Sequence, residues 1–201
     1  MWQIGSPGGE DGPDEEFLRR MGAPDNELPV ALPVNALLAR TGDAAIAVMG
    51  LQVYSTGVSM TLLVRVREAL SPRRGLHELV HGFGGPGLLV GVGLADGRRV
   101  ASGGVARNDP DLVWQPTGGS GDDRSVEQGW WLSPLPPDGP LTLVVRCPEL
   151  GVEEVATEFD GTAVRAAAAG VVELWPWTPP FLGMPDSPPP DLPPGSWFAG
   201  P

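Results

Sequence analysis

Two histidines and one glutamate are the residues of this chain whose spacing could perform chemistry. His77 and His81 are the only histidines among 201 residues, and Glu78 directly follows the first. On a helix, residues four positions apart lie on the same face, so both imidazoles could bind one Zn²⁺. Glu78 would then accept a proton from the metal-bound water, which is the chemistry of metal-assisted hydrolysis.

This pattern is similar to the H-E-x-x-H helix motif of zinc peptidases, and Gly84 extends it to H-E-x-x-H-x-x-G. In one class of these enzymes a third histidine follows the glycine by three positions, where this chain has Gly87. A third ligand would therefore be a carboxylate outside any recognisable second motif, the candidates being Glu127, Glu173 and Asp109. A zinc-dependent metallohydrolase or peptidase, with zinc on both histidines and Glu78 as base, is the alternative interpretation.

The residues around the motif favour a structural role. Ser71 and Pro72 are typical of a helix start, and Gly82 is typical of a helix end, which frames a short helix of about ten residues. Leu76, Leu79 and Val80 form an apolar stripe along it that would pack on a sheet. The histidines would then lie on the solvent side of a connecting helix.

Alternation of apolar and polar residues dominates the rest of the chain and predicts β-strands. In residues 58–66 the even-numbered positions are all apolar, which indicates a strand buried on one face. Further strands are predicted at 30–38, 45–54, 88–94, 98–102, 112–115, 126–132, 141–147 and 155–159. Many short strands separated by Gly/Pro turns indicate an all-β fold, a single immunoglobulin-like β-sandwich with one or two short helices. A second helix is expected at 162–174, with Asp160 near its cap.

The chain divides into three segments by composition. Residues 1–26 are rich in Gly, Pro and acidic residues and are expected to form a flexible arm with one short helical stretch at 14–21. Residues 27–177 carry the predicted sandwich domain. Residues 178–201 are Pro-rich and are expected to form a flexible tail.

Charge and cysteine usage restrict the environment and the partners. The net charge is −12 and every cation is an arginine, so a partner nucleic acid or an anionic membrane surface is not expected. The start of the chain lacks the apolar run of a signal peptide, and no stretch approaches about 18 apolar residues. Cys147 is the only cysteine and is expected to be buried and inert, so we predict a cytoplasmic protein.

A flexible polar loop and a pair of tryptophans are the best candidates for a binding surface. The loop is predicted at 117–125 and carries Asp122 and Asp123. Trp130 and Trp131 are adjacent, so on a strand one enters the core and the other is exposed or covered by a tail or partner. The leading interpretation is a non-enzymatic binding or interaction module without a cofactor, whose partner is a protein or small ligand.

Two stretches of the chain resemble those of uncharacterised proteins from high-GC bacteria. They are LPVNALLARTGDAAIAVMGLQVYSTG at 32–57 and GWWLSPLPPDGPLTLVV at 129–145. The resemblance implies no activity, substrate or partner.

Overall fold

Most of the regular structure of this protein is antiparallel β-sheet. The computed structural model describes residues 15–70, 75–82, 87–104 and 108–179. A five-stranded sheet has the order β2 (Val30–Arg40), β3 (Ala44–Val53), β4 (Val58–Val66), β8 (Ser125–Ser133) and β7 (Val113–Gly121). A four-stranded sheet has the order β10 (Val152–Asp160), β9 (Pro140–Cys147), β5 (Leu89–Gly93) and β6 (Arg99–Ala101). A small third sheet pairs β1 (Glu27–Leu28) with β11 (Val172–Glu173).

The helices in the described residues are short. The α-helices are α1 (Glu15–Arg20), α2 (Leu76–His81) and α3 (Gly161–Ala167). The 3₁₀ turns are η1 (Ser102–Gly104), η2 (Pro148–Leu150) and η3 (Ala168–Gly170). Among the described residues, none of these helices has the length and apolar character needed to cross a bilayer.

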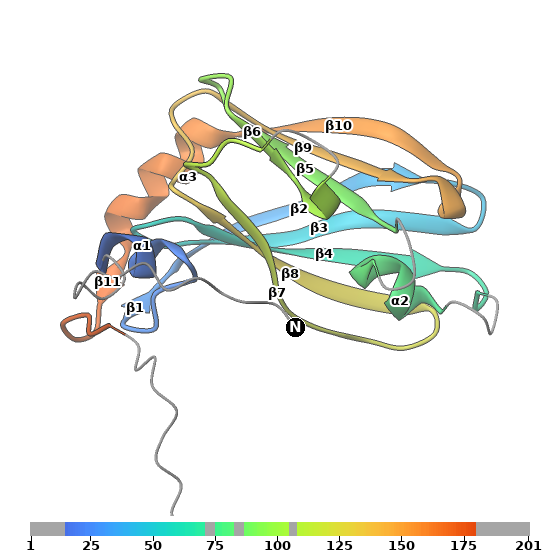
Figure 1. Ribbon diagram of the computed structural model, residues 1–201, viewed down its shortest axis with the longest axis horizontal. Helices are drawn as coiled ribbons and strands as arrows, with labels where there is room; N and C mark the ends of the chain where they lie inside the picture. Colours follow the sequence, from blue (N-terminus) through green and yellow to red (C-terminus); the bar gives the residue numbers. More distant parts are fainter. Residues whose placement is uncertain (1–14, 71–74, 83–86, 105–107, 180–201) are drawn as a thin grey trace, which may run out of the picture.

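The two large sheets lie one above the other, and their inward faces form a common core (Figure 1). Apolar residues at every second position of a strand produce this common core, because every second side chain points to the same face of the sheet. In β4 the inward residues are Val58, Met60, Leu62, Val64 and Val66, all buried. Burying a Val or Leu side chain contributes about 1.5–3 kcal/mol, so this core is the main stabilising feature. Cys147 belongs to the core and is buried, as predicted.

The predicted strands are confirmed, with one informative difference in β7. The prediction ended this strand at 115 and placed a loop at 117–125, but β7 continues to Gly121. Gly119, Ser120 and Gly121 pair with β8 beyond a register shift that follows Pro116. Only residues 122–124 remain as the turn, so the prediction of a long loop was wrong.

The helix predictions are confirmed in part. Gly82 ends α2 in the left-handed conformation, with φ of 72°, while the Ser71 and Pro72 start signal lies outside the described residues. Asp160 caps α3 by accepting a hydrogen bond from the Ala163 N–H at 3.0 Å. This helix is shorter than predicted. After Gly170 the backbone adopts an extended conformation and pairs with β1.

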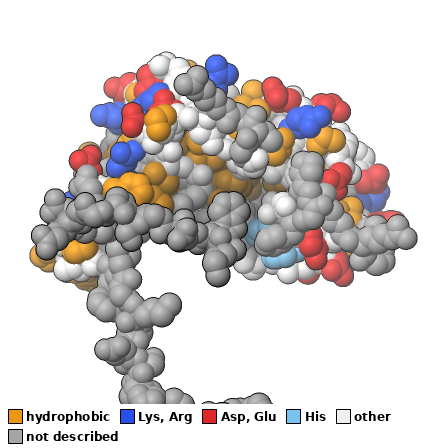
Figure 2. All heavy atoms as spheres, in the orientation of Figure 1, with side chains coloured by type: hydrophobic (Ala, Val, Ile, Leu, Met, Phe, Trp, Pro, Cys, Tyr) orange, Lys and Arg blue, Asp and Glu red, His pale blue; other side chains and the backbone are white. Residues whose placement is uncertain are grey.

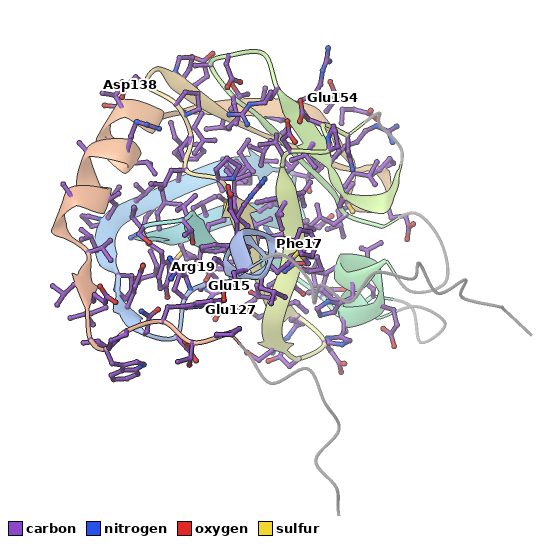
Figure 3. The ribbon with its side chains drawn as sticks, turned by 60° about the vertical axis from the view of Figure 1, so that its left-hand side comes forward. Glu15, Phe17, Arg19, Glu127, Asp138 and Glu154 are labelled. Carbon is purple, nitrogen blue, oxygen red and sulfur yellow. The ribbon has the colours of Figure 1, made fainter. Side chains whose placement is uncertain are left out.

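The described part of the N-terminal segment is docked on the five-stranded sheet. Figures 1 and 3 show α1 lying against this sheet, with Glu15, Phe17 and Arg19 labelled on the helix. Asn26 is 4% exposed and donates from Nδ2 to the Trp175 carbonyl at 2.9 Å. Residues 15–26 therefore extend the folded unit beyond the predicted boundary at 27.

Candidate functional site

The histidine motif lies on α2, which packs on β8. Leu76, Leu79 and Val80 are buried beneath the helix, as the apolar stripe predicted. His77 is exposed, but His81 is half-buried and lines a pocket, so the prediction that both histidines face solvent holds only for His77. The centroids of the two rings are 4.1 Å apart with planes at 56°.

The described residues do not complete a metal site around these histidines. Within them there is no group of three or more His, Cys, Asp or Glu side chains placed to hold one ion. The Glu78 carboxylate folds back over Gly75, where an added Cβ would lie 2.6 Å from Oε2. Glu127, a proposed third ligand, is exposed on β8, while Gln128 beside it faces inward.

A pocket of about 660 Å³ opens between the edges of the two sheets, where β7 approaches β6 and α2 closes one side. Figure 2 shows hydrophobic surface in the hollow between the two layers and the histidine surface near it. The described lining residues are Val80, His81, Gly82, Gly87, Leu88, Leu89, Ala101, Ser102, Gly103, Asn108, Trp114, Pro116, Gln128 and Trp130. The pocket is thus mostly apolar with a few polar groups, which is typical of small-molecule sites.

Two stacked indoles form one wall of the pocket. Trp114 on β7 and Trp130 on β8 have ring centroids 4.6 Å apart and planes within 17° of parallel. The Trp114 Nε1–H donates to the Val90 carbonyl at 3.2 Å and so ties β7 to the opposite sheet. Trp130 is 4% exposed. The wall is therefore held in place from both sheets.

Two polar side chains of this wall are almost completely buried, since Gln128 is 1% exposed and Trp130 is 4% exposed. Nε1 of Trp130 has no hydrogen-bond partner among the described residues. The orientation of the Gln128 amide is fixed, because Nε2 donates to the Thr117 carbonyl at 2.7 Å and to the Gly129 carbonyl at 2.9 Å. The Gln128 amide is therefore held by neighbouring groups of the protein.

His81 is the only ionisable side chain among the described lining residues. Burial lowers its pKa below the ordinary histidine value, and repulsion from His77 lowers it further. A side-chain hydrogen bond with Gln128 opposes part of this shift and raises the pKa, because the amide oxygen stabilises the protonated ring. The ring is therefore mainly uncharged at neutral pH, and so is this side of the pocket.

The structure separates the predicted binding residues. Asp122 closes the β7–β8 turn, because Oδ1 accepts from the backbone N–H of Arg124 at 2.8 Å and of Ser125 at 2.9 Å. These bonds lower the pKa of Asp122. Trp130 lies five residues along β8 from Ser125, roughly 17 Å at about 3.3 Å per residue. Asp122 and its neighbour Asp123 are therefore not part of the pocket.

The adjacent tryptophans point to opposite faces, as predicted. Trp130 faces the core and the pocket, whereas Trp131 faces outward and is covered. Its Nε1–H donates to the Arg20 carbonyl at 2.8 Å, and Tyr54 meets its ring edge-on with centroids 5.7 Å apart. Trp131 is thus sealed by the N-terminal segment, one of the outcomes that the sequence left open.

Sequence reasoning missed Trp114 and Gln128. A signal for Gln128 was present, because it alternates with Val126, Trp130 and Leu132 and so occupies an inward position on its strand. A polar residue in such a position indicates a partner or a ligand. Trp114 carried no such signal, because its contact with Trp130 depends on the pairing of β7 with β8.

Comparisons of the chain with protein-family models, with curated proteins and with solved structures found no match.

Proposed function

We propose that this protein is a non-enzymatic binding module and that the pocket between β6 and β7 is its ligand site. The observation that carries the proposal is a hollow of about 660 Å³ whose wall is a rigid pair of stacked indoles. Pockets for small ligands have volumes of about 300–1,000 Å³ and combine apolar walls with a few convergent polar groups.

The chemistry of the described lining supports binding rather than catalysis. Ser102 carries the only hydroxyl among the described lining side chains, and its oxygen accepts from the Val90 N–H at 2.9 Å, a contact within the fold. The described lining contains no carboxylate and no thiol. Cys147 lies in the core, and a single buried thiol supports the further proposal of a reducing, cytoplasmic environment.

We further propose that the fold is an immunoglobulin-like β-sandwich. The order β3-β4-β8-β7 corresponds to the A-B-E-D sheet of such domains, and β10-β9-β5-β6 corresponds to G-F-C-C′, with every connection in the matching chain order. The strand β2 adds an extra edge beside the A position. Cys147 lies on the F-position strand, but a disulfide to the B position cannot form because the chain has one cysteine.

The test is a screen of neutral small molecules by thermal unfolding, followed by NMR of the indole N–H signals. A ligand that binds the folded state raises Tm in a concentration-dependent manner. We expect shifts confined to the signals of Trp114 and Trp130, and loss of binding in Trp114→Ala. The matched control is Trp175→Ala, because Trp175 is 56% exposed and does not line the pocket.

Two results would contradict the proposal. The first is that no compound raises Tm. The second is that ligands bind equally well to Trp114→Ala, provided that the indole signal of Trp130 shows that this variant is folded. Hydrolysis of a peptide or ester by the protein, lost in Glu78→Gln, would instead favour the zinc hydrolase.

A further inference from the structure

A second hollow, a groove of about 540 Å³, lies on the outer face of the four-stranded sheet. Figure 1 shows this sheet as the upper layer, with that face turned away from the five-stranded sheet. In β5 the side chains of Val90 and Val92 are buried in the core, so the outward positions are Leu89, Gly91 and Gly93. Two of these three positions carry no side chain, and a trough therefore follows β5 between its neighbours β6 and β9.

The fold itself does not require glycine at these two positions. A Cβ added to Gly91 would meet nothing closer than 3.5 Å, and one added to Gly93 nothing closer than 3.7 Å. Neither residue has a positive φ. On β7, by contrast, a Cβ at Gly119 would lie 2.7 Å from the Glu127 carbonyl oxygen, so packing requires that glycine. Glycine inside a strand weakens it and often marks a place where a ligand or another backbone approaches closely.

The walls of the trough are apolar in the middle. Ala101 of β6 and Val144 of β9 pair with Gly91 on either side, and both are half-buried. From Leu89 to Gly93 the trough is roughly 13 Å long at about 3.3 Å per residue. It therefore has the length of about five residues of an extended chain.

One end of the trough offers an unpaired cation. Arg99 pairs with Gly93 in the sheet and is exposed. Its guanidinium has no hydrogen-bond or ion-pair partner among the described residues. The neighbouring Arg98 is already bound to Asp96, with Nη2 2.8 Å from Oδ2. An unpaired arginine beside an apolar trough favours an incoming carboxylate, which it can hold with two parallel hydrogen bonds.

The other end of the trough carries the opposite charge as well. Arg146 pairs with Leu89, and its Nη2 lies 3.9 Å from Oε2 of Glu153. Glu154, on the irregular part of β10 beside Arg146, also lines the groove and is labelled in Figure 3. These carboxylates repel a further acid. The charge pattern therefore gives a ligand a direction, with its acidic group at the Arg99 end.

We propose that this trough binds an extended peptide segment of a partner protein, with an acidic residue paired to Arg99 and apolar residues over Gly91 and towards Leu89. Alternate residues of an extended peptide point the same way at a spacing of about 6.6 Å, which is also the spacing of the outward positions on β5. The open side of the trough leaves the backbone groups of the peptide in water, so none of them is buried unpaired.

The size of the face favours a peptide over a second copy of the chain. Stable dimer interfaces bury about 800 Å² on each partner. The trough lies between β6, of three residues, and β9, of eight residues. Three strands over the length of β5 have a projected area of roughly 240 Å², at about 3.3 Å per residue and 4.8 Å per strand. Such a face accommodates one extended segment.

The experiment titrates the full-length protein with the acetylated, amidated pentapeptide Glu-Ser-Ala-Ser-Val and follows the backbone amide signals of Gly91 and Gly93 by NMR. In this probe Glu, Ala and Val face the sheet and both Ser residues face water. The charge control is Lys-Ser-Ala-Ser-Val, and sodium acetate tests for binding of a carboxylate alone. We expect the Glu peptide to shift both glycine signals and to bind at least about fivefold more tightly than either control, the effect of an exposed ion pair of about 1 kcal/mol.

Two variants test the floor and the cation separately. Gly91→Val fills the trough and should weaken binding of the Glu peptide at least about tenfold. Its Tm should equal or exceed that of the wild type, because valine suits a strand better than glycine. Arg99→Glu should weaken binding of the Glu peptide at least about fivefold and strengthen binding of the Lys peptide.

Each variant has a matched control on the other large sheet. Gly118→Val adds the same bulk on β7, where nothing lies within 4 Å of the added Cβ, and should leave the affinity for the Glu peptide unchanged. Arg40→Glu changes the net charge as Arg99→Glu does, at an exposed position of β2, and should also leave that affinity unchanged.

The outcomes are independent of the ligand pocket, because neither Gly91 nor Arg99 lines it. The proposal is overturned if the Glu peptide does not shift the Gly91 and Gly93 signals at about 10 mM, well above a Kd of 1 mM. It is also overturned if acetate or the Lys peptide binds as tightly, or if Gly91→Val retains full affinity or fails to fold. Shifts of the same signals with protein concentration alone would show instead that this face joins two copies of the chain.

Discussion

The indole N–H of Trp131 donates to the backbone carbonyl of Arg20 at 2.8 Å and links β8 to α1 across 111 positions of sequence. A residue on the outer face of the sheet is buried by this contact with the N-terminal segment. The segment also reaches the neighbouring strand, because the Gln115 side chain donates to the Met21 carbonyl and the Arg20 guanidinium donates to the Asp111 carbonyl. Residues 20 and 21 of this segment are therefore bound to the folded domain.

Removal of residues 1–22 should destabilise the domain. Trp131, which is 0% exposed, would then face solvent and lose its hydrogen bond. We expect a loss of about 2–4 kcal/mol in the free energy of unfolding, measured by urea denaturation, and a red shift of the tryptophan fluorescence. A free energy of unfolding equal to that of the full chain would show that the docked segment contributes little.

Gly57→Ala should be strongly destabilising because Gly57 lies against Trp131. An added Cβ would lie 2.3 Å from the Leu132 carbonyl oxygen and 2.7 Å from Cζ2 of Trp131. Overpacking of this kind costs about 1–3 kcal/mol. Gly118→Ala is the matched control, since nothing lies within 4 Å of its added Cβ, and it should change the stability by less than about 0.5 kcal/mol. A Tm for Gly57→Ala equal to that of the control would contradict the packing described here.

Zinc binding to α2 is the prediction that separates the two functional interpretations. Two histidines four positions apart bind metal weakly without further ligands, and the described residues offer no third one nearby. We expect purified protein to contain far less than one equivalent of zinc by atomic emission, and His77→Ala to unfold at the same Tm as the wild type. Stoichiometric zinc that disappears in His77→Ala would instead support the metallohydrolase.

The stability of the domain should fall as the pH decreases below about 6.5, the ordinary pKa of histidine. Burial and the proximity of His77 lower the pKa of His81 in the folded protein. In this pH range the unfolded chain binds a proton more readily than the folded one, so acid favours unfolding. Urea denaturation at several pH values checks this. His81→Gln should reduce the dependence of the free energy of unfolding on pH in this range. If this variant shows the same pH dependence as the wild type, other groups cause it.

The strands were predictable from sequence because each one carries its own alternation. Residues 58–66 show this clearly, since burial alternates along β4 as the sequence does. The pocket was not predictable in the same way, because it depends on which strands become neighbours. Trp114 and Trp130 meet only through the register of β7 on β8, and Val90 reaches Trp114 only because the two sheets face each other. Nothing local in the sequence specifies these contacts.

The histidine motif shows what a local pattern leaves unspecified. The spacing of His77, Glu78 and His81 is compatible with zinc chemistry, and the helix it requires is present. What the pattern does not contain is the surroundings of the helix. Leu76, Leu79 and Val80 dock it on β8, and this docking brings His81 to the pocket while leaving His77 exposed.

The outermost strands of the two large sheets are poor templates for pairing with another chain. At the edges of the five-stranded sheet, β2 contains Pro33 and β7 contains Pro116, and proline cannot donate a ladder hydrogen bond. At the edges of the four-stranded sheet, β6 has only three residues, and β10 exposes the carboxylates Glu153, Glu154 and Glu158. Short, charged or proline-containing borders prevent strands of separate molecules from joining. A protein so rich in β-structure should therefore resist assembly into fibrils even when it is concentrated.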